Sequence, residues 1–340
     1  MKKVRIVAII IALATATATL STLIIASINY EDAYLPEMLI WEDMPMNTNK
    51  NFQYFSFYCG DYRDGALDEI LDLNCSNVVF MSSDGYAMRD SLLKCRQHNV
   101  KAMVDWDNGV SVNSNYCPDL LEEFDDVIYG FKFDEPWWNN KSMESFHYYT
   151  RTLRQDYPDK EVYAVLALGE FASVPKFLLD MIAASGDFPT DKAPEGYYKY
   201  CTILAFDFYC AWEAYSKLYL QYFAELKALC TEGQRIWFVP KGFYADSSFN
   251  TFVENHKVPK GDEMITVLKE HYKLALTEPL VEGMVIFAYK DGSRSDWGIA
   301  VENFVLEDSP HYREEVKLYY QQVGRAIIHN ADFKIVRTDL

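Results

Sequence analysis

The sequence lacks the motifs by which several large enzyme classes bind phosphates and metals. No G-x-G-x-x-G run follows its first expected strand, and it has no G-x-x-x-x-G-K loop, which argues against dinucleotide-binding and P-loop proteins. Its six histidines avoid the ends of all expected strands, with His256, in the loop after the seventh strand, as the nearest exception. Its seven cysteines include no C-x-x-C pair. We therefore expect no metal site, no cofactor and no Ser-His catalysis.

Positive charge is also scarce. The chain has 32 Lys and Arg residues against 50 Asp and Glu residues, a formal net charge of -18. Such a surface repels nucleic acid, so the sequence predicts no nucleic-acid partner and favours a protein that handles neutral ligands.

The odd number of cysteines leaves at least one free, and we expect mostly buried thiols with at most one disulfide.

The N-terminus has the features of an export signal. "MKKVR" is followed by an uncharged stretch from Ile6 to Tyr30. Its apolar core and the small residues of "ATATA" are typical of a cleaved signal peptide. The uncharged stretch, about 25 residues, is also long enough for an uncleaved anchor that would attach the chain to a membrane through residues 6–29. Both alternatives predict a secreted or cell-surface protein.

The rest of the chain alternates between strand and helix patterns. Each of eight apolar runs is followed by a segment of helical period, as in 216–230. This pattern predicts a single α/β domain, a closed (β/α)8 barrel of the TIM type, rather than an open doubly wound sheet. We expect a signal peptide or anchor over 1–30, a lead-in over 31–50, the barrel over 51–330 and a C-terminal tail over 331–340. The expected strands are 51–58, 77–83, 101–106, 128–133, 161–168, 201–209, 235–244 and 281–289.

The residues at the expected strand ends are mostly carboxylates and aromatic rings. In such barrels the reactive groups lie at the carboxyl ends of the strands. Aromatic faces stack on sugar rings and carboxylates bind their hydroxyls, so this rim predicts a carbohydrate ligand. The candidate substrate-binding residues are Asp134, Asp105, Trp106, Trp137, Tyr209, Lys241 and Tyr289.

The stretch "DEPWW", Asp134 to Trp138, contains the strongest catalytic candidate. Hydrolysis of a glycosidic bond requires a protonated carboxyl group and a second, ionised one. Indole rings beside Glu135 would reduce its solvation and raise its pKa, which suits a general acid. A structural alternative is that Asp134 caps the next helix and Pro136 occupies its first turn.

Glu135 before Pro136 at the end of the fourth strand resembles the N-E-P acid/base motif of the barrel superfamily of glycoside hydrolases. The resemblance implies that Glu135 is the acid/base, with Asp134 in the position of the Asn. One departure is that the seventh strand, where those families carry a nucleophilic Glu, has Lys241 and no acid.

The sixth strand, "LAFDFYCAW", is similar instead to that of chitinase-like barrels, in which a fourth-strand Glu is the acid. Their full fourth-strand pattern of alternating acids is not met, because Phe131 and Phe133 replace the first two. We therefore expect Asp207 to be the second catalytic carboxylate, with Asp105 and Asp84 as alternatives.

Together these patterns predict an exported glycoside hydrolase that uses Glu135 and Asp207. A catalytically inactive carbohydrate-binding barrel is the alternative, favoured by the missing seventh-strand acid. A Schiff-base lyase that uses Lys241 is less favoured, because Pro240 and Gly242 fit a turn that directs this lysine toward a hydroxyl or carboxylate.

Overall fold

The computed structural model describes residues 41, 44–58, 66–81, 85–106, 117–140, 142–175, 191–210, 212–245, 261–287, 296–298 and 314–329. Apart from Trp41, all of them belong to one compact unit, Asp43–Phe333. The expected export segment 1–30, most of the lead-in and the tail 331–340 lie outside the described residues. None of the helices within these ranges is both long and apolar enough to cross a bilayer.

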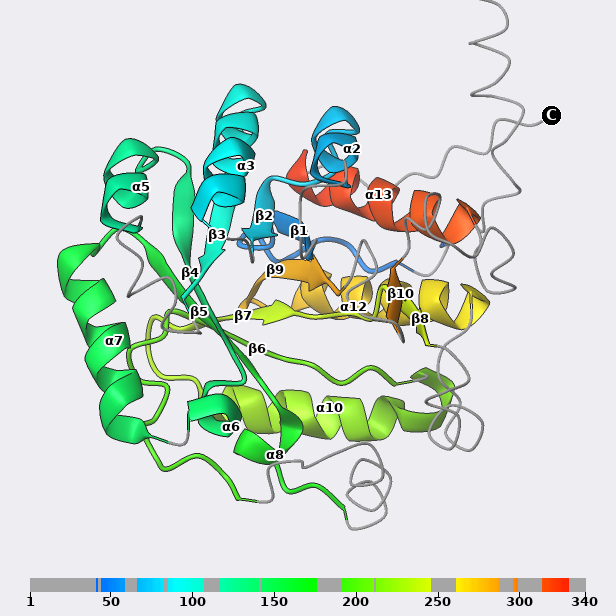
Figure 1. Cartoon of the computed structure of the whole chain (residues 1–340). Coiled ribbons are helices and arrows are strands. Elements are labelled where there is room, and N and C mark those ends of the chain that lie inside the picture. The colour runs from blue at the N-terminus through cyan, green and yellow to red at the C-terminus, as the bar shows by residue number, and fades with distance from the viewer. Residues whose placement is uncertain are drawn as a thin grey trace, which may run out of the picture. The chain divides into compact units, whose positions relative to one another are not determined.

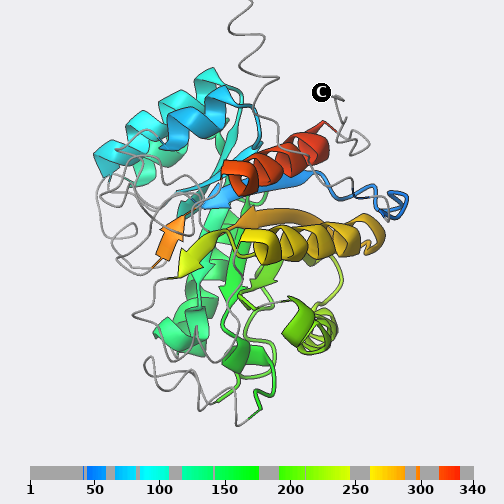
Figure 2. The same ribbon diagram turned by 90° about the vertical axis from the view of Figure 1, so that its right-hand side faces the viewer.

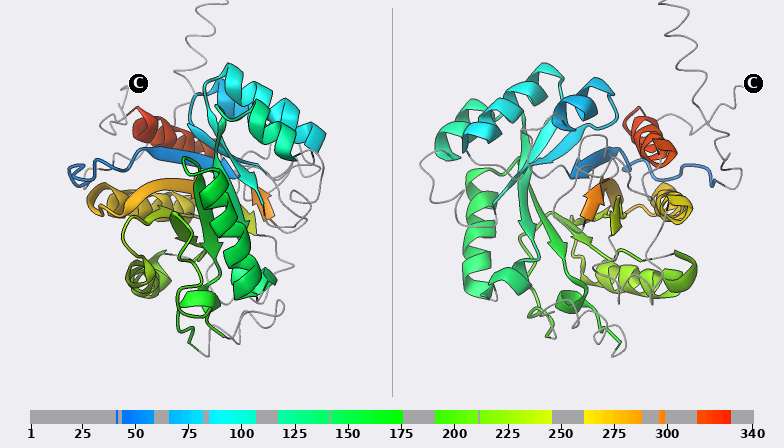
Figure 3. Two further views of the ribbon diagram at one scale, coloured as in Figure 1. Left: turned by 90° about the vertical axis from the view of Figure 1, so that its left-hand side faces the viewer. Right: turned by 45° about the vertical axis from the view of Figure 1, so that its right-hand side comes forward.

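Eight parallel strands close into a barrel, each paired with its neighbours in chain order (Figures 1 and 3). All eight expected runs contribute one strand, so the predicted (β/α)8 fold is confirmed. The strands are β1 (Tyr54–Tyr58), β2 (Val78–Met81), β3 (Lys101–Asp105), β4 (Ile128–Asp134), β5 (Glu161–Leu166), β6 (Ile203–Phe206), β7 (Arg235–Phe238) and β9 (Val281–Ile286).

Helices surround the strands, and α12 and α13 lie side by side over β9 and β1 (Figures 1 and 2). The helix expected after the fifth strand falls largely on 176–190, outside the described residues. The described helices are α2 (Ala66–Asp72), α3 (Gly85–Gln97), α5 (Cys117–Glu123), α6 (Pro136–Asn140), α7 (Met143–Asp156), α8 (Leu168–Phe171), α10 (Trp212–Leu229), α12 (Gly261–Thr277) and α13 (Glu314–Ile328).

The seventh expected strand, 235–244, is shorter than predicted. β7 ends at Phe238, and only isolated bridges continue the pairing, at Val239 and Lys241. Pro240 has no N–H group to donate to a ladder, which accounts for the interruption. The chain then forms a separate strand, β8 (Phe243–Ala245), which pairs antiparallel with β10 (Asp296–Gly298) in a two-stranded sheet (Figure 1).

The indole of Trp237 fills the barrel interior and is fully buried. It stacks on Tyr54, with ring centroids 5.4 Å apart, and lies 6.3 Å from the ring of Tyr129. Gly283 of β9 is in register with both Trp237 and Tyr54. A Cβ atom at Gly283 would lie 2.6 Å from an indole carbon, so only glycine leaves room for these rings to stack.

A set of charged groups holds this layer in place from the amino-terminal side. The indole N–H of Trp237 donates to Glu282 at 3.3 Å, and Arg235 bridges Glu282 and Glu161. The positive charge of Arg235 lies between the two carboxylates, which allows these groups to remain partly buried next to an aromatic layer. The described side chains at the amino-terminal end of the barrel interior are thus buried against one another.

We predict that Gly283→Ala lowers the free energy of unfolding by about 1–3 kcal/mol, because the added methyl group overpacks the Trp237 layer. Urea denaturation of the full chain would measure this loss. In a Trp237→Phe background, where a smaller ring faces Gly283, the same substitution should cost less. An equal cost in both backgrounds would show that the indole does not impose the glycine.

Candidate functional site

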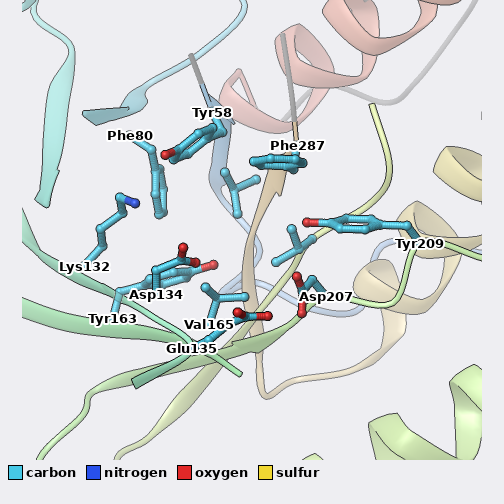
Figure 4. A pocket seen from close by; sticks show the side chains of 12 residues that line it. Tyr58, Phe80, Lys132, Asp134, Glu135, Tyr163, Val165, Asp207, Tyr209 and Phe287 are labelled. Carbon is cyan, nitrogen blue, oxygen red and sulfur yellow. The ribbon is translucent and has the colours of Figure 1, made fainter. Parts of the chain in front are cut away.

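A cavity of about 180 Å³ lies above the Trp237 layer, at the carboxyl ends of the strands (Figure 4). It exceeds the roughly 150 Å³ cavity known to hold one benzene ring, so it is of a size for one ring-shaped ligand group. Its lining combines three carboxyl groups, one lysine and five aromatic rings. The lining residues are Tyr58, Phe80, Lys132, Asp134, Glu135, Tyr163, Val165, Asp207, Tyr209, Val239, Val285 and Phe287.

Asp134 and Glu135 both line this cavity, although they are adjacent in sequence. Successive side chains of a regular strand point to opposite faces, so one of the two should point away. The backbone of Glu135 has φ of +41°, in the left-handed region that non-glycine residues seldom adopt. β4 ends at Asp134, and this conformation turns the next side chain back into the barrel. Such strain is typical of functional sites.

The three carboxyl groups of the cavity come close together, and Glu135 and Asp207 lie on neighbouring parts of its wall (Figure 4). Burial, followed by the charge of Asp134, raises the pKa of Glu135 to about 7. Burial also raises the pKa of Asp207 well above its ordinary value, and Glu135 and Asp134 add to this rise. The pKa of Asp134 is raised as well, mainly by burial. Glu135 therefore keeps its proton in part near neutral pH.

Lys132 is the cation among the described lining residues. It is two residues before Asp134 on β4 and is almost fully buried. Its ammonium group lies 3.4 Å from Asp105 of β3 and 4.7 Å above the ring of Tyr58. This ion pair links the carboxyl ends of two neighbouring strands at the wall of the cavity.

From Tyr58 onward the wall is aromatic. Phe287 packs against Tyr58, with centroids 5.1 Å apart, and stacks with Tyr209 at 5.7 Å. The floor is formed in part by Phe80 and Tyr163, which meet edge to face at 4.9 Å. A ligand in this cavity would therefore contact apolar ring faces on one side and carboxylates on the other.

The structure brings together four of the predicted site residues in the cavity: Glu135, Asp207, Asp134 and Tyr209. Asp105 does not line the cavity itself but forms an ion pair with Lys132, which does. Asp84, an alternative for the second carboxylate, and Tyr289, a candidate substrate-binding residue, both fall outside the described residues.

The predicted tryptophans have other surroundings. Trp106 packs edge to face on Phe131 at 5.0 Å. The indole N–H of Trp137 donates to the carbonyl of Asp191 at 3.0 Å, and its ring packs on Tyr197. Neither lines the cavity, and the pKa of Glu135 is raised mainly by burial and, after that, by the charge of Asp134.

Lys241 is buried but does not line the cavity. Its carbonyl accepts a hydrogen bond from Tyr320 of α13. This placement removes the basis for expecting a Schiff base at Lys241 in the described pocket. Five of the described cysteines are free thiols, four of them buried: Cys75, Cys95, Cys201, Cys210 and Cys230.

Sequence reasoning missed Lys132 by misjudging which residues of β4 face inward. Phe131 packs on Tyr157 and Phe133 on Phe146 of α7, so both phenylalanines point out toward the helices. The polar residues between them, Lys132 and Asp134, face the barrel. The period-two pattern of "FKFD" contained this signal.

Sequence reasoning also gave Glu170 no role. This residue is almost fully buried at α8, directly behind the "DEPWW" stretch. One of its carboxylate oxygens accepts from the backbone N–H of Trp138 at 2.6 Å, and the other accepts from the hydroxyl of Tyr198 at 2.9 Å.

Among the side chains that the structure describes, no group of three His, Cys, Asp or Glu residues is arranged to hold a metal ion.

No protein-family model matches this chain, and no curated protein matches it in sequence. Its fold is similar to solved glycoside hydrolases. The GH2 β-galacturonidase from Eisenbergiella tayi, bound to galacturonate, has a TM-score of 0.51 and 12% identity over 81% of this chain and 51% of that chain. A GH113 β-1,4-mannanase has a TM-score of 0.49 and 10% identity over 79% of this chain and 98% of that chain.

This chain thus spans about half the length of the galacturonidase. At 12% identity the likeness establishes the fold alone, an eight-stranded parallel barrel that glycoside hydrolases also use. The resemblance that the "DEP" motif implied is therefore present at the level of architecture, while the individual family is not identified.

Proposed function

We propose that this chain is a glycoside hydrolase in which Glu135 is the general acid and Asp207 the second carboxylate. The observation that carries the proposal is the left-handed backbone of Glu135, which brings its carboxyl group into the same cavity as Asp207 and Asp134. A protein that needed only a stable strand end would have no reason to strain the backbone and gather three carboxyl groups.

In the proposed reaction the carboxyl group of Glu135 donates its proton to the glycosidic oxygen as the bond from that oxygen to the anomeric carbon breaks. A pKa raised to about 7 keeps this group protonated in part at neutral pH. A water molecule supplies the new oxygen on the anomeric carbon, and its proton passes to a carboxylate.

Asp207 must be ionised to accept that proton or to stabilise positive charge on the sugar ring. Its pKa is raised because burial deprives the charged form of solvent. Hydroxyl groups of a bound sugar would donate hydrogen bonds to it and so favour the charged form. Lys132 places a positive charge on the opposite side of the cavity from Asp207 (Figure 4).

The second candidate function is a carbohydrate-binding barrel without catalysis. The observation in its favour is that neither β7 nor the described residues after it, through Ala245, contribute an acid to the cavity. The aromatic wall at Phe287 and Tyr209 would serve either function. Glycan binding without hydrolysis by the full chain would support this second candidate.

We expect Glu135→Gln to reduce hydrolysis of a susceptible oligosaccharide by about 10²–10⁴-fold, because the amide cannot donate a proton to the leaving oxygen. The measurement is a panel of oligosaccharides incubated with the full chain and the variant. On aryl glycosides with good leaving groups, which need little protonation, the variant should retain much more activity than on natural linkages. Asp207→Asn should be impaired on both substrate types.

Glu144→Gln, an exposed change on α7, is the matched control for loss of one carboxylate and should leave activity unchanged. Activity of Glu135→Gln equal to that of the unmodified chain on all substrates would refute the assignment of the acid.

The pH dependence follows from the direction of the Glu135 shift. A general acid works in its protonated form, so activity should be present below pH 7 and fall as the pH rises through about 7. A carboxyl with an ordinary pKa would lose this activity more than two pH units lower. Initial rates between pH 4 and 9 on a substrate with a poor leaving group would separate these cases.

Export remains part of the proposal on the strength of the uncharged stretch 6–30 behind Lys2, Lys3 and Arg5. The full chain expressed with its own N-terminus should fractionate with the membrane or the medium. N-terminal sequencing would show whether residues 1–30 have been removed. A full-length product confined to the cytoplasm would contradict export.

A further inference from the structure

The backbone around Glu135 has the hydrogen bonding of a helix start. α6 begins at Pro136, and the carbonyl of Glu135 accepts the first helical bond, from the N–H of Asn139 at 2.9 Å. Glu135 is therefore the N-cap residue of α6. The side chain at this position ordinarily accepts a hydrogen bond from the backbone N–H two or three residues later.

The next helix shows the ordinary arrangement. At the start of α7 the N-cap is Ser142, and its hydroxyl oxygen accepts from the N–H of Ser145, three residues later, at 3.2 Å. At α6 the corresponding N–H belongs to Trp138, and it donates instead to Glu170, at 2.6 Å. A side chain 35 positions along the chain from Glu135 therefore performs the capping that Glu135 would ordinarily perform.

Hydrogen bonds from Tyr198 and Ala193 hold Glu170 in the position from which it caps α6. Its second oxygen accepts from the hydroxyl of Tyr198 at 2.9 Å, and its backbone carbonyl accepts from the N–H of Ala193 at 2.7 Å. The neighbouring Tyr197 donates through its hydroxyl to the carbonyl of Pro136 at 3.1 Å. The segment before β6 thus fixes both Glu170 and the first residue of α6.

From this geometry we infer that Glu170 is a positioning residue that caps α6 in place of Glu135 and so leaves the Glu135 carboxyl group in the cavity. The inference rests on the proposed function only in that Glu135 is the acid of that reaction. Without the acceptor at Glu170, the Trp138 N–H would lose this hydrogen bond, and the carboxylate of Glu135, three residues earlier, is at the position that ordinarily accepts from it.

The charge of Glu170 bears on the same site. Burial raises the pKa of Glu170 to about 8, while its two hydrogen bonds lower it. Near neutral pH its side chain is thus largely uncharged and acts mainly through its hydrogen bonds. Glutamine has the same shape as the neutral carboxyl group and can still accept from Trp138, which makes Glu170→Gln the matched control for Glu170→Ala.

The test is a titration of Glu135 itself in the full chain, followed by the NMR signals of glutamate carboxyl carbons. The Glu135 signal is identified by its loss in Glu135→Gln. Both Glu170→Gln and Glu170→Ala remove the charge of Glu170, so only the loss of the acceptor distinguishes them. We expect the Glu135 midpoint in Glu170→Ala to lie about 1–2 pH units below that in Glu170→Gln, because capping stabilises the ionised form of Glu135.

Equal Glu135 midpoints in the two variants would overturn the inference. If Glu170→Ala does not fold, the titration of Tyr198→Phe decides, since Glu170 then keeps its carboxylate but loses the hydroxyl that orients it. A midpoint below that of the unmodified chain supports the positioning role, and an unchanged midpoint overturns it. No glycan is needed, so failure of the hydrolysis assays would leave this result intact.

Discussion

The stacking of Trp237 across the barrel interior determines where this protein can have a site. The indole occupies the full width of the space between β7 and β1, and this is possible only because Gly283 has no side chain. Below this layer the interior is closed by rings and by the ion pairs of Arg235. Toward the carboxyl ends of the strands, Val239 and Val285, each two positions after Trp237 and Gly283, line the cavity. The depth and floor of the site thus follow from one aromatic layer.

The second constraint is the alternation of side chains along β4. Lys132 and Asp134 face the barrel because Phe131 and Phe133 are needed to pack against α7 and its C-terminal neighbour Tyr157. A third inward group on this strand end is available only if the chain leaves the strand conformation, and Glu135 does so at φ +41°. The adjacent acids therefore reach one cavity at a cost in backbone strain of about 1–3 kcal/mol.

The fold could be predicted from sequence because its signal is repeated. Eight apolar runs, each followed by a helical pattern, admit few architectures, and the strands were recovered with small errors at their ends. The exception, the early end of β7 before Pro240, depends on a single missing N–H group. Strand-end logic likewise found Glu135, Asp207 and Asp134, since all three lie where parallel strands end.

The rest of the site could not be predicted, for physical reasons that differ from residue to residue. Lys132 lies between two large apolar residues, and only its position in the period-two pattern distinguishes it from a strand interior. The indole of Trp137 is directed away from the cavity by the carbonyl of Asp191, a contact across 54 positions that no local pattern contains. The positive φ of Glu135 is also not encoded locally, because glutamate has no intrinsic preference for it.

Three carboxyl groups in one desolvated cavity would be unstable if all were charged, and the raised pKa values of Glu135, Asp134 and Asp207 express that cost. One described lysine, already paired with Asp105, does not compensate three negative charges. The cluster must therefore share protons or receive hydrogen bonds from a ligand. A sugar meets this requirement, because it brings hydroxyl donors to the carboxylates and an apolar face to Phe287 and Tyr209 without adding charge. The electrostatic cost of the site is thus an argument for a polar, neutral ligand.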